Sequence, residues 1–590
     1  MYKVGSAIRD ITILLDGCGM LGYGMFHNVT KSIETPIYAR AFVIEQGSQK
    51  IAFVNAEVCF ITMGLKDAIV AYVSKRSQGW SHDNIMITAQ HTHSAPGGFT
   101  HYFFYNITVS GFKQEVFDHF TEGIAEVILA AEEKVKPSKI FMGKGTFDEK
   151  VDVAFNRSLK PYNANKEVRQ KVRKNEAHLA VDREMKMLRF EGDDGRPIGC
   201  LNWFGVHTTS ISNDNTSICS DNKGYAADYF EKAYSELFPG KEKIISIFAQ
   251  DTAGDVTPNY VWDKRKKWTR GRYEDDFESA RYNGQLQFEK AREIFEKALS
   301  GKAITGQIDY ETIYVDFSRV KVAPRFADGK KHQRTANACL GVSFLEGTRE
   351  GPGMSKAVGH FGRFSWGLAK LYRKYLMSHF MPYKEKVEML NTFKSQYPKS
   401  AILEMGTGHV MGTKQVRRLI IPAFADPVIR YFKYLDKTGY TKFKPWSPEV
   451  LPLQIMIIGE FAIVGVPAEM TTMAGQRLRN TVKEVLTKRG VSEVMLSTYA
   501  NGYAGYTTTH EEYMFQHYEG GHTLFGKWTL AAYQTRFEEL AGEMLRPKEL
   551  RFKGTSFDEE PPAKPRIFDK HEIWHGVREE DLRIFDTTRI

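Results

Sequence analysis

The stretch from Ile85 to Gly98 (IMITAQHTHSAPGG) constrains the fold of this chain more than any other. Its first part is a short apolar run that predicts a buried strand, and the Ser-Ala-Pro-Gly-Gly at its end can neither continue a strand nor begin a helix cleanly. His91 and His93 stand at this junction, and a spacing of two directs both imidazoles to one side of an extended chain. The pair is typical either of a metal site at a strand end or of two hydrogen-bonded loop histidines, and the pattern alone leaves both open.

The same pattern, an apolar strand that ends in polar residues, recurs further along the chain. The run from Cys200 to Val206 ends at His207, which adds a third imidazole at a strand end. The run from Ile244 to Gln250 delivers a turn over 251–259, where Gly, Asp, Pro and Asn favour tight backbone bends. Chemistry in α/β proteins commonly gathers at such strand ends.

Predicted helices alternate with these strands. Helical patterns cover 112–133 and 276–300, and a third helix is predicted from Glu469 to Leu486, after a hairpin over 453–467. A carboxylate at a helix N-terminus is favoured by the helix dipole, so Glu469 is either an ordinary terminal residue or a functional one. The alternation predicts an α/β or mixed α+β core.

A chain of 590 residues exceeds the usual size of one core, which favours two or more domains or one large domain with a small addition. After about residue 550 the sequence turns polar and is interrupted by Pro, so we predict a main domain over 1–550 and a strap or tail over 551–590. Apolar side chains spaced among the charges of this tail predict anchoring contacts: Phe552, Phe557, Ile567, Phe568, Ile573 and Trp574.

The net charge of +10 permits attraction to anionic lipid or nucleic acid. Basic residues concentrate in 160–174 and 264–272, but neither an RNA-binding nor a helix-turn-helix pattern accompanies them, so we predict solvated loop faces and no nucleic-acid partner. Five cysteines without a C-x-x-C pair suit a reducing compartment. With no signal-peptide pattern and no apolar run long enough to span a bilayer, the sequence predicts a soluble protein, cytoplasmic by default.

Over roughly residues 4 to 548 the chain resembles the neutral (non-lysosomal, neutral/alkaline) ceramidase family. The resemblance is carried by ordered segments along the whole of this range: 90–98 (QHTHSAPGG), 155–158 (FNRS), 220–226 (SDNKGYA), 254–259 (GDVTPN), 346–348 (EGT) with 351–353 (GPG), 467–475 (PAEMTTMAG), 506–509 (YTTT) and 526–533 (GKWTLAAY).

The resemblance implies one zinc ion per chain, held by His91, His207, Glu469 and Tyr506. It also implies that His93 and Tyr518 act on the substrate beside the metal and that Arg157 contacts substrate oxygens. The family turn usually reads Gly-Asp-Val-Ser-Pro-Asn, and here Thr257 stands in place of the serine. Thr257 keeps a hydroxyl, so the resemblance assigns it the same catalytic and substrate-binding position.

The resemblance implies a large α/β (mixed α+β) catalytic domain of the neutral ceramidase type. The family typically carries a C-terminal immunoglobulin-like β domain, and with about forty residues after 550 we predict that this domain is absent. The implied activity is hydrolysis of the N-acyl amide bond of ceramide to a sphingoid base and a fatty acid. Two alternatives stay open: a zinc amidase acting on another N-acyl lipid or N-acyl amino acid, and a non-catalytic protein that binds lipids or polyanions. Peripheral contact with an anionic membrane is compatible with the basic surface, family members are often secreted, and the oligomeric state is not predicted.

Overall fold

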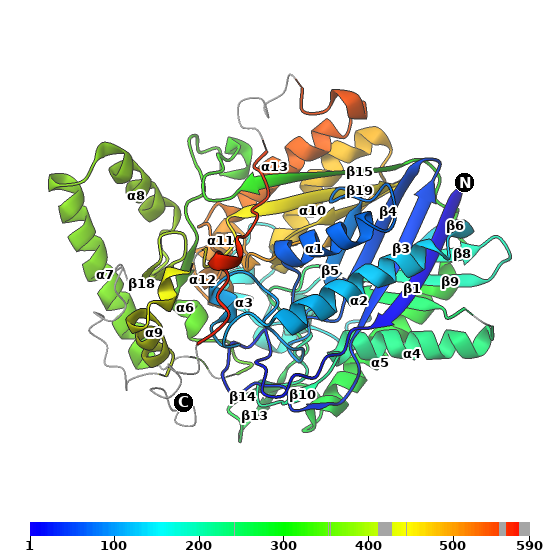
Figure 1. Cartoon of the computed structure of the whole chain (residues 1–590), viewed down its shortest axis with the longest axis horizontal. Coiled ribbons are helices and arrows are strands. Elements are labelled where there is room, and N and C mark those ends of the chain that lie inside the picture. Colours follow the sequence, from blue (N-terminus) through cyan, green and yellow to red (C-terminus); the bar gives the residue numbers. More distant parts are fainter. Residues whose placement is uncertain are drawn as a thin grey trace.

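The computed structural model describes residues 1–240, 242–351, 353, 356–410, 427–443, 445–553 and 562–577. Two β-sheets lie face to face, and helices cover their outer faces (Figure 1). The predicted mixed α/β fold class is therefore confirmed, in a four-layered α/β/β/α arrangement.

The larger sheet has eight strands in the order β11-β9-β8-β6-β1-β3-β4-β5. The β4–β5 and β9–β11 pairs are parallel, and the other neighbours are antiparallel. Its strands are β1 (Tyr2–Asp10), β3 (Tyr38–Gln46), β4 (Gln49–Ala56), β5 (Ile85–Ala89), β6 (Lys136–Thr146), β8 (Glu184–Gly192), β9 (Pro197–Trp203) and β11 (Ile245–Ala249).

The smaller sheet has four strands in the order β15-β19-β20-β22, and its β20–β22 pair is parallel. These strands are β15 (Ile308–Asp316), β19 (Val450–Ile458), β20 (Phe461–Gly465) and β22 (Glu493–Ser497). The β19–β20 hairpin confirms the hairpin predicted over 453–467.

Successive side chains along each strand point to opposite faces of the sheet, so they fall into different apolar layers. Phe42 and Phe53 of the large sheet point inward and pack with Trp203 against the small sheet, where they meet Phe461. Their neighbours Ala41, Val43 and Val54 point outward into the helical layer, because successive strand residues face opposite sides. The sequence therefore builds one apolar layer between the sheets and another outside each.

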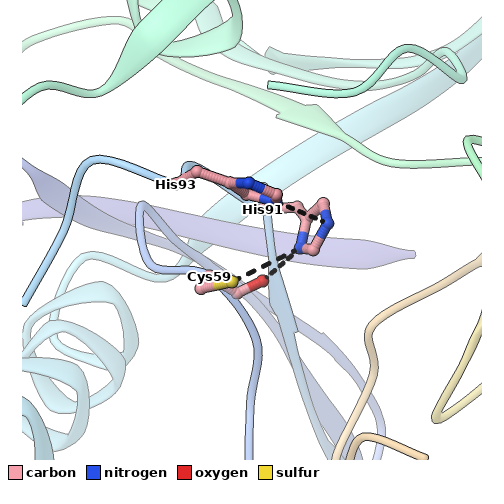
Figure 2. A group of neighbouring side chains, drawn as sticks. All are labelled: Cys59, His91 and His93. Carbon is pink, nitrogen blue, oxygen red and sulfur yellow. Dashed lines mark hydrogen bonds between the residues drawn. The ribbon is translucent and has the colours of Figure 1, made fainter. Parts of the chain in front are cut away.

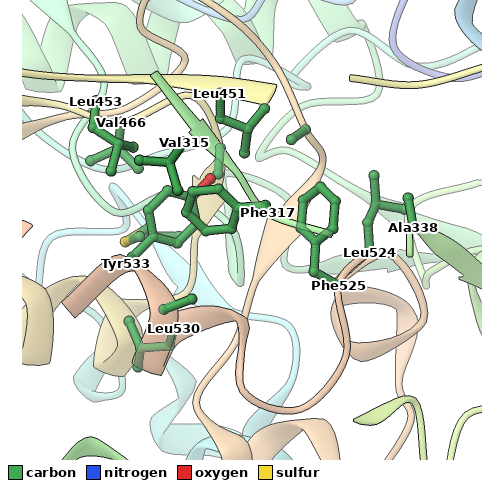
Figure 3. Close-up of a cluster of buried hydrophobic side chains, with 14 of the residues drawn as sticks. Val315, Phe317, Ala338, Leu451, Leu453, Val466, Leu524, Phe525, Leu530 and Tyr533 are labelled. Atoms are coloured by element: carbon green, nitrogen blue, oxygen red, sulfur yellow. The ribbon is translucent and has the colours of Figure 1, made fainter. Parts of the chain in front are cut away.

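Three pairs of helices cover the sheets. The helices α1 (Met63–Ser74) and α2 (Gln114–Glu132) pack on one half of the large sheet, and α4 (Asp221–Leu237) and α5 (Asp276–Ala298) on the other. The helices α10 (Thr472–Leu486) and α13 (Thr529–Glu543) cover the small sheet. Figure 3 shows part of that layer, where Phe317, Phe525 and Tyr533 pack ring against ring. The helices predicted over 112–133 and 276–300 are thus confirmed within two residues at each end.

Four more helices stand at one edge of the molecule, away from the stacked sheets (Figure 1). They are α6 (Val342–Leu345), α7 (Lys356–His379), α8 (Tyr383–Ser395) and α9 (Pro427–Lys437). Within the described ranges, every helix is either too short or too polar to cross a membrane.

Part of the predicted strap over 551–590 lies within the described ranges. Trp574 is 1% exposed and packs its ring 5.0 Å from that of Phe103, and Phe568 contacts the rings of His101 and Tyr102. Ile567, in contrast, is 85% exposed, and Phe557 lies outside the described residues. The boundary at residue 550 and the anchoring role of this segment stay predictions.

Candidate metal centre

Four buried side chains meet where strands of both sheets end. His91 follows β5 and His207 follows β9 of the large sheet, while Glu469 and Tyr506 follow β20 and β22 of the small one. Glu469 and Tyr506 lie opposite each other in a short parallel pair, β21 (Glu469–Met470) with β23 (Tyr506–Thr507). The helix predicted to begin at Glu469 begins at Thr472, because this strand pairing holds the carboxylate ahead of it.

The ligand-type atoms of these residues converge. Glu469 Oε2 lies 3.1 Å from His207 Nε2 and 3.6 Å from His91 Nε2, and the Tyr506 hydroxyl lies 3.3 Å from His207 Nε2. All four side chains are at most 4% exposed. His91, His207 and Glu469 form one of two groups of described residues whose donor atoms could hold a metal ion, and the other group is Cys59, His91 and His93.

Backbone carbonyls fix the orientation of both imidazoles. His91 Nδ1 lies 2.6 Å from the Cys59 carbonyl (Figure 2), and His207 Nδ1 lies 2.6 Å from the Ala253 carbonyl. A carbonyl only accepts, so each Nδ1 carries the proton and each Nε2 presents a lone pair in the neutral ring. Burial lowers the pKa of His91 to about 4, so its ring is neutral at ordinary pH.

Tyrosine hydroxyls hold the carboxylate of Glu469. Tyr499 donates to Oε2 at 3.1 Å, and Tyr503 donates to Oε1. Burial would raise the pKa of Glu469, but His91, His207 and the Tyr503 hydroxyl hold it well below its usual range. The carboxylate is therefore ionised although its side chain is buried.

These donors fit a metal ion. When both Nε2 atoms are unprotonated, their lone pairs and the carboxylate oxygen repel one another, and a metal cation between them removes that repulsion. Ligands placed about 2.0–2.1 Å from a tetrahedral zinc lie about 3.4 Å apart, and the distances among His91, His207, Glu469 and Tyr506 bracket that value. Imidazole nitrogen with carboxylate oxygen is a ligand set that suits zinc among the transition metals.

The backbone is strained at the same place. His91 has a φ of +79° and Tyr499 a φ of +55°, and their rings stack 4.2 Å apart. The assumption that His91 and His93 share an extended chain is wrong, because β5 ends at Ala89 and His91 is left-handed. Non-glycine residues at positive φ cost about 1–3 kcal/mol and cluster at functional sites.

His93 nevertheless lies beside His91, with Nε2 atoms 3.1 Å apart and rings nearly perpendicular (Figure 2). It is not part of the group formed by His91, His207 and Glu469. Gly22 makes room for its ring: a Cβ at that glycine would lie 2.3 Å from a ring carbon of His93. The role of His93 on the substrate stays a prediction.

Arg157 is brought to the site by a short pairing of β7 (Phe155–Asn156) with β12 (Val256–Thr257). Its NH2 donates to the Tyr506 hydroxyl at 3.0 Å, and it forms ion pairs with Glu350 at 2.6 Å and Glu519 at 3.0 Å. Burial raises the pKa of the Tyr506 phenol, and the Arg157 charge opposes that rise. The predicted substrate contact of Arg157 is untested, and the structure adds a contact with a candidate metal ligand.

Sequence reasoning did not identify Glu350 and Glu519, although both are buried partners of Arg157. Glu350 falls between two of the matching segments, 346–348 and 351–353, which was the available signal. Tyr499 and Tyr503, which bond Glu469, were also missed, and only the aromatic character of the loop at 499–506 pointed to them.

The Thr257 hydroxyl donates to Glu350 and accepts from the Asn259 backbone N–H at 2.9 Å. Thr257 is 3% exposed, and it does not line the cavity above the candidate ligands that is described next. It therefore reaches Arg157 through Glu350, while its predicted catalytic and substrate-binding roles stay untested.

A cavity of about 640 Å³ opens above the four candidate ligands. His91, His93, His207, Glu469 and Tyr506 line its floor. Apolar side chains from loops, short helices and a strand line its walls: Leu21, Phe26, Phe60, Phe104, Ile107, Phe344, Leu345, Leu403 and Phe432.

Tyr518 also lines the cavity. Its ring meets that of Tyr506 edge-on at 5.5 Å, and the Arg157 guanidinium lies 5.4 Å from the ring centre. The loop between these tyrosines thus returns Tyr518 to the site, as the resemblance requires for a residue acting there. Its function stays a prediction.

Fold and site together define an α/β protein whose buried His-His-Glu group, able to hold a metal, lies at the floor of an apolar cavity. The family model described as neutral/alkaline non-lysosomal ceramidase, N-terminal, matches residues 2–416 and 432–535, and the chain belongs to this family.

The chain is 33% identical over 544 residues to a neutral ceramidase of Pseudomonas aeruginosa, covering 92% of this chain and 72% of that protein. It is 31% identical to neutral ceramidase A of Dictyostelium discoideum, covering 92% of this chain and 73% of that one. The crystal structure of the Pseudomonas aeruginosa neutral ceramidase matches with a TM-score of 0.72 and 29% identity over 96% of this chain and 76% of that chain. A ceramidase complexed with C2 matches with a TM-score of 0.73 and 31% identity, over 96% of this chain and 77% of that chain.

Proposed function

We propose that this chain hydrolyses the N-acyl amide bond of ceramide and that it does so with one zinc ion held by His91, His207, Glu469 and Tyr506. The observation that carries the proposal is the convergence of two imidazole Nε2 atoms and a carboxylate oxygen at the floor of an apolar cavity. Membership in the neutral/alkaline ceramidase family supports the choice of substrate.

Zinc, when bound, supplies a Lewis acid that polarises the amide carbonyl and makes a water molecule acidic enough to attack near neutral pH. The chain supplies everything else. The carbonyls of Cys59 and Ala253 keep the proton of each histidine on Nδ1, so Nε2 stays available. The Arg157 guanidinium donates to the Tyr506 hydroxyl, which favours the electron-rich form of the phenol.

An amide also needs a donor for the oxygen that becomes negative and an acid for the departing amine. We assign these tasks to the two side chains that border the candidate ligands. Tyr518 keeps its hydroxyl proton, because burial raises its pKa well above the usual value, and it therefore serves as a donor. His93 lies 3.1 Å from His91 and takes the proton that the attacking water loses, then passes it to the departing amine.

The cavity suits the apolar part of such a substrate. Its volume of about 640 Å³ lies within the range of ordinary ligand pockets, and its walls are mostly aliphatic and aromatic. Burying an acyl chain against these walls is favourable by about 25 cal/mol per Å² of apolar surface removed from water. This favours an N-acyl lipid over an N-acyl amino acid, because the carboxylate of the latter would meet Arg157, whose charge is already paired with Glu350 and Glu519.

The test is metal analysis combined with an amide-release assay. The protein is stripped with a chelator, reloaded with zinc and assayed on ceramide, other N-acyl lipids and N-acyl amino acids in detergent micelles. The proposal predicts one zinc per chain and release of fatty acid from ceramide only after reloading. Equal activity without metal would refute the zinc assignment, and faster release from another N-acyl class would refute ceramide as the substrate.

A further inference from the structure

The helix α7 exposes a continuous apolar stripe. Four large side chains are spaced four, three and one positions apart, which places them on one helical face: Phe364 (63% exposed), Leu368 (49%), Leu371 (66%) and Tyr372 (62%). The opposite face is the packed one, because Trp366 is 7% exposed and meets the ring of Phe393 at 6.0 Å. The stripe is thus the outward face of a helix that is already anchored.

The connection to α8 and the first turns of that helix expose further apolar side chains. Phe380 is 76% exposed, and Tyr383, Val387 and Leu390, at positions i, i+4 and i+7 of one helical face, are 83%, 42% and 44% exposed. We call the stripe and these four residues the hairpin surface. Soluble proteins rarely leave so many neighbouring large apolar side chains uncovered, and such patches mark interaction sites.

Lysine and arginine outnumber acidic residues around the hairpin surface, although its α8 part also carries Glu385 and Glu388. From Gly351 to Lys384 the sequence contains six Lys and Arg residues and no Asp or Glu. Arg363 and Arg373 form ion pairs with Glu346 and Glu404 outside this stretch. In the described part of the chain, Lys374 forms no ion pair, so its charge faces solvent.

The segment that precedes α7 lines the cavity. Phe344, Leu345, Gly351 and Gly353 are among the residues that line the cavity, and α7 begins at Lys356. Phe432 of α9 lines it as well. Figure 1 shows α7 and α8 on the same edge of the molecule as α9, away from the stacked sheets.

We propose that the hairpin surface docks this protein on an anionic lipid bilayer, with the cavity mouth beside the membrane. Exposed apolar side chains flanked by lysines are what an interfacial helix uses to enter the headgroup region of such a bilayer. A second copy of the chain fits less well, since a symmetric contact would bring the same cations face to face. The benefit of docking rests on the proposed function, because ceramide is a bilayer lipid, but the docking itself is measurable without substrate.

The experiment compares binding of the full chain to vesicles of phosphatidylcholine with and without phosphatidylserine, by sedimentation. The hairpin variant carries Phe364→Gln, Leu368→Gln, Leu371→Gln and Tyr372→Gln. Its matched control carries Leu237→Gln and Leu299→Gln, which remove exposed apolar side chains of α4 and of the end of α5. We expect wild type and control to bind the vesicles with phosphatidylserine more tightly than those without it. The hairpin variant should bind the vesicles with phosphatidylserine about tenfold more weakly than wild type does, or more weakly still.

A second variant tests the charge separately. Replacing Lys374→Glu and Lys384→Glu leaves the apolar stripe in place and should lower binding to phosphatidylserine vesicles by about tenfold, with little change for phosphatidylcholine alone. Both variants should unfold at the wild-type temperature, because they alter exposed positions. Wild-type binding to the phosphatidylserine vesicles should fall as salt is raised.

Activity in detergent micelles separates this proposal from the proposed function. Both variants should hydrolyse micellar ceramide as wild type does and lose activity only on ceramide embedded in vesicles. Absence of micellar hydrolysis in all proteins would refute the proposed function and leave the vesicle result standing. Equal vesicle binding by wild type and the hairpin variant would overturn docking, as would a wild-type dimer that the hairpin variant dissociates.

Discussion

The floor of the cavity buries polar side chains, whereas the hairpin surface exposes apolar ones. At the floor, His91, His207 and Glu469 are at most 2% exposed, and each has a partner that fixes its orientation. On the hairpin surface, large apolar side chains such as Phe364 and Tyr383 are more than 60% exposed. Both arrangements cost stability: one buries charge, and the other leaves apolar area in water.

This difference predicts how substitutions in each region should affect activity and binding. The floor relies on a few atoms at fixed distances, so one substitution there removes an irreplaceable group. The hairpin surface relies on summed apolar area and charge, so single substitutions there matter little and several are needed. Removing a floor residue should therefore abolish activity on every form of the substrate, which the hairpin variants should not do.

The largest effect is expected from loss of a candidate ligand. Glu469→Gln and His207→Ala should release the metal and lower ceramide hydrolysis by about 10⁴-fold or more, in micelles and vesicles alike, because they remove a charge or a lone pair from the group. Metal content and fatty-acid release measured on the same sample check this. Glu460→Gln, at an exposed turn between β19 and β20, is the control. Full metal content in Glu469→Gln would show that the carboxylate is not a ligand.

A second prediction asks whether burial, rather than apolar character, decides the role of an aromatic or aliphatic residue. Trp574→Ala should lower the free energy of unfolding by about 3–5 kcal/mol, because its ring is 1% exposed and packs against Phe103. Ile567→Ala, at 85% exposure, should change it by less than about 0.5 kcal/mol. Denaturant unfolding of both variants gives the comparison. Equal stabilities would mean that residues 562–577 do not anchor the tail.

A third prediction separates the two tyrosines. Tyr506→Phe should weaken metal binding, because its hydroxyl lies 3.3 Å from His207 Nε2 within the candidate group. Tyr518→Phe should keep the metal and lower turnover by about 10²-fold, the usual effect of one lost oxyanion donor. Metal content and kcat are measured in both variants. Metal loss from Tyr518→Phe, or unchanged kcat there, would mean that the two roles are assigned wrongly.

The smallest effect on turnover is expected at Gly22, which is not one of the candidate metal ligands. Gly22→Ala should displace the His93 ring, since a Cβ there would lie 2.3 Å from it, and should lower kcat by about tenfold while the metal stays bound. Gly24→Ala shares the cost of a side chain at positive φ but meets nothing within 4 Å. Equal kcat in the two variants would argue against a role for His93 in turnover, and His93→Ala should lower kcat at least as much as Gly22→Ala.

The sequence alone determined the elements and the chemical character of their ends. Local alternation and apolar runs predicted the β19–β20 hairpin, the long helix α5 and the strand that leads to His91. These features depend on neighbours a few residues apart, so a single segment carries the signal. The resemblance added family membership and the four candidate ligands, because its matching segments are ordered along the chain.

Only the tertiary structure decided how these ends meet. Glu350 and Glu519 join Arg157 from 193 and 362 positions away, and no local pattern relates such distant residues. The left-handed His91 could not be predicted either, because its strained φ is imposed by packing against Tyr499 and by the Cys59 carbonyl. Backbone preference is local, whereas the convergence of charged groups in a buried site is set by contacts between the two sheets.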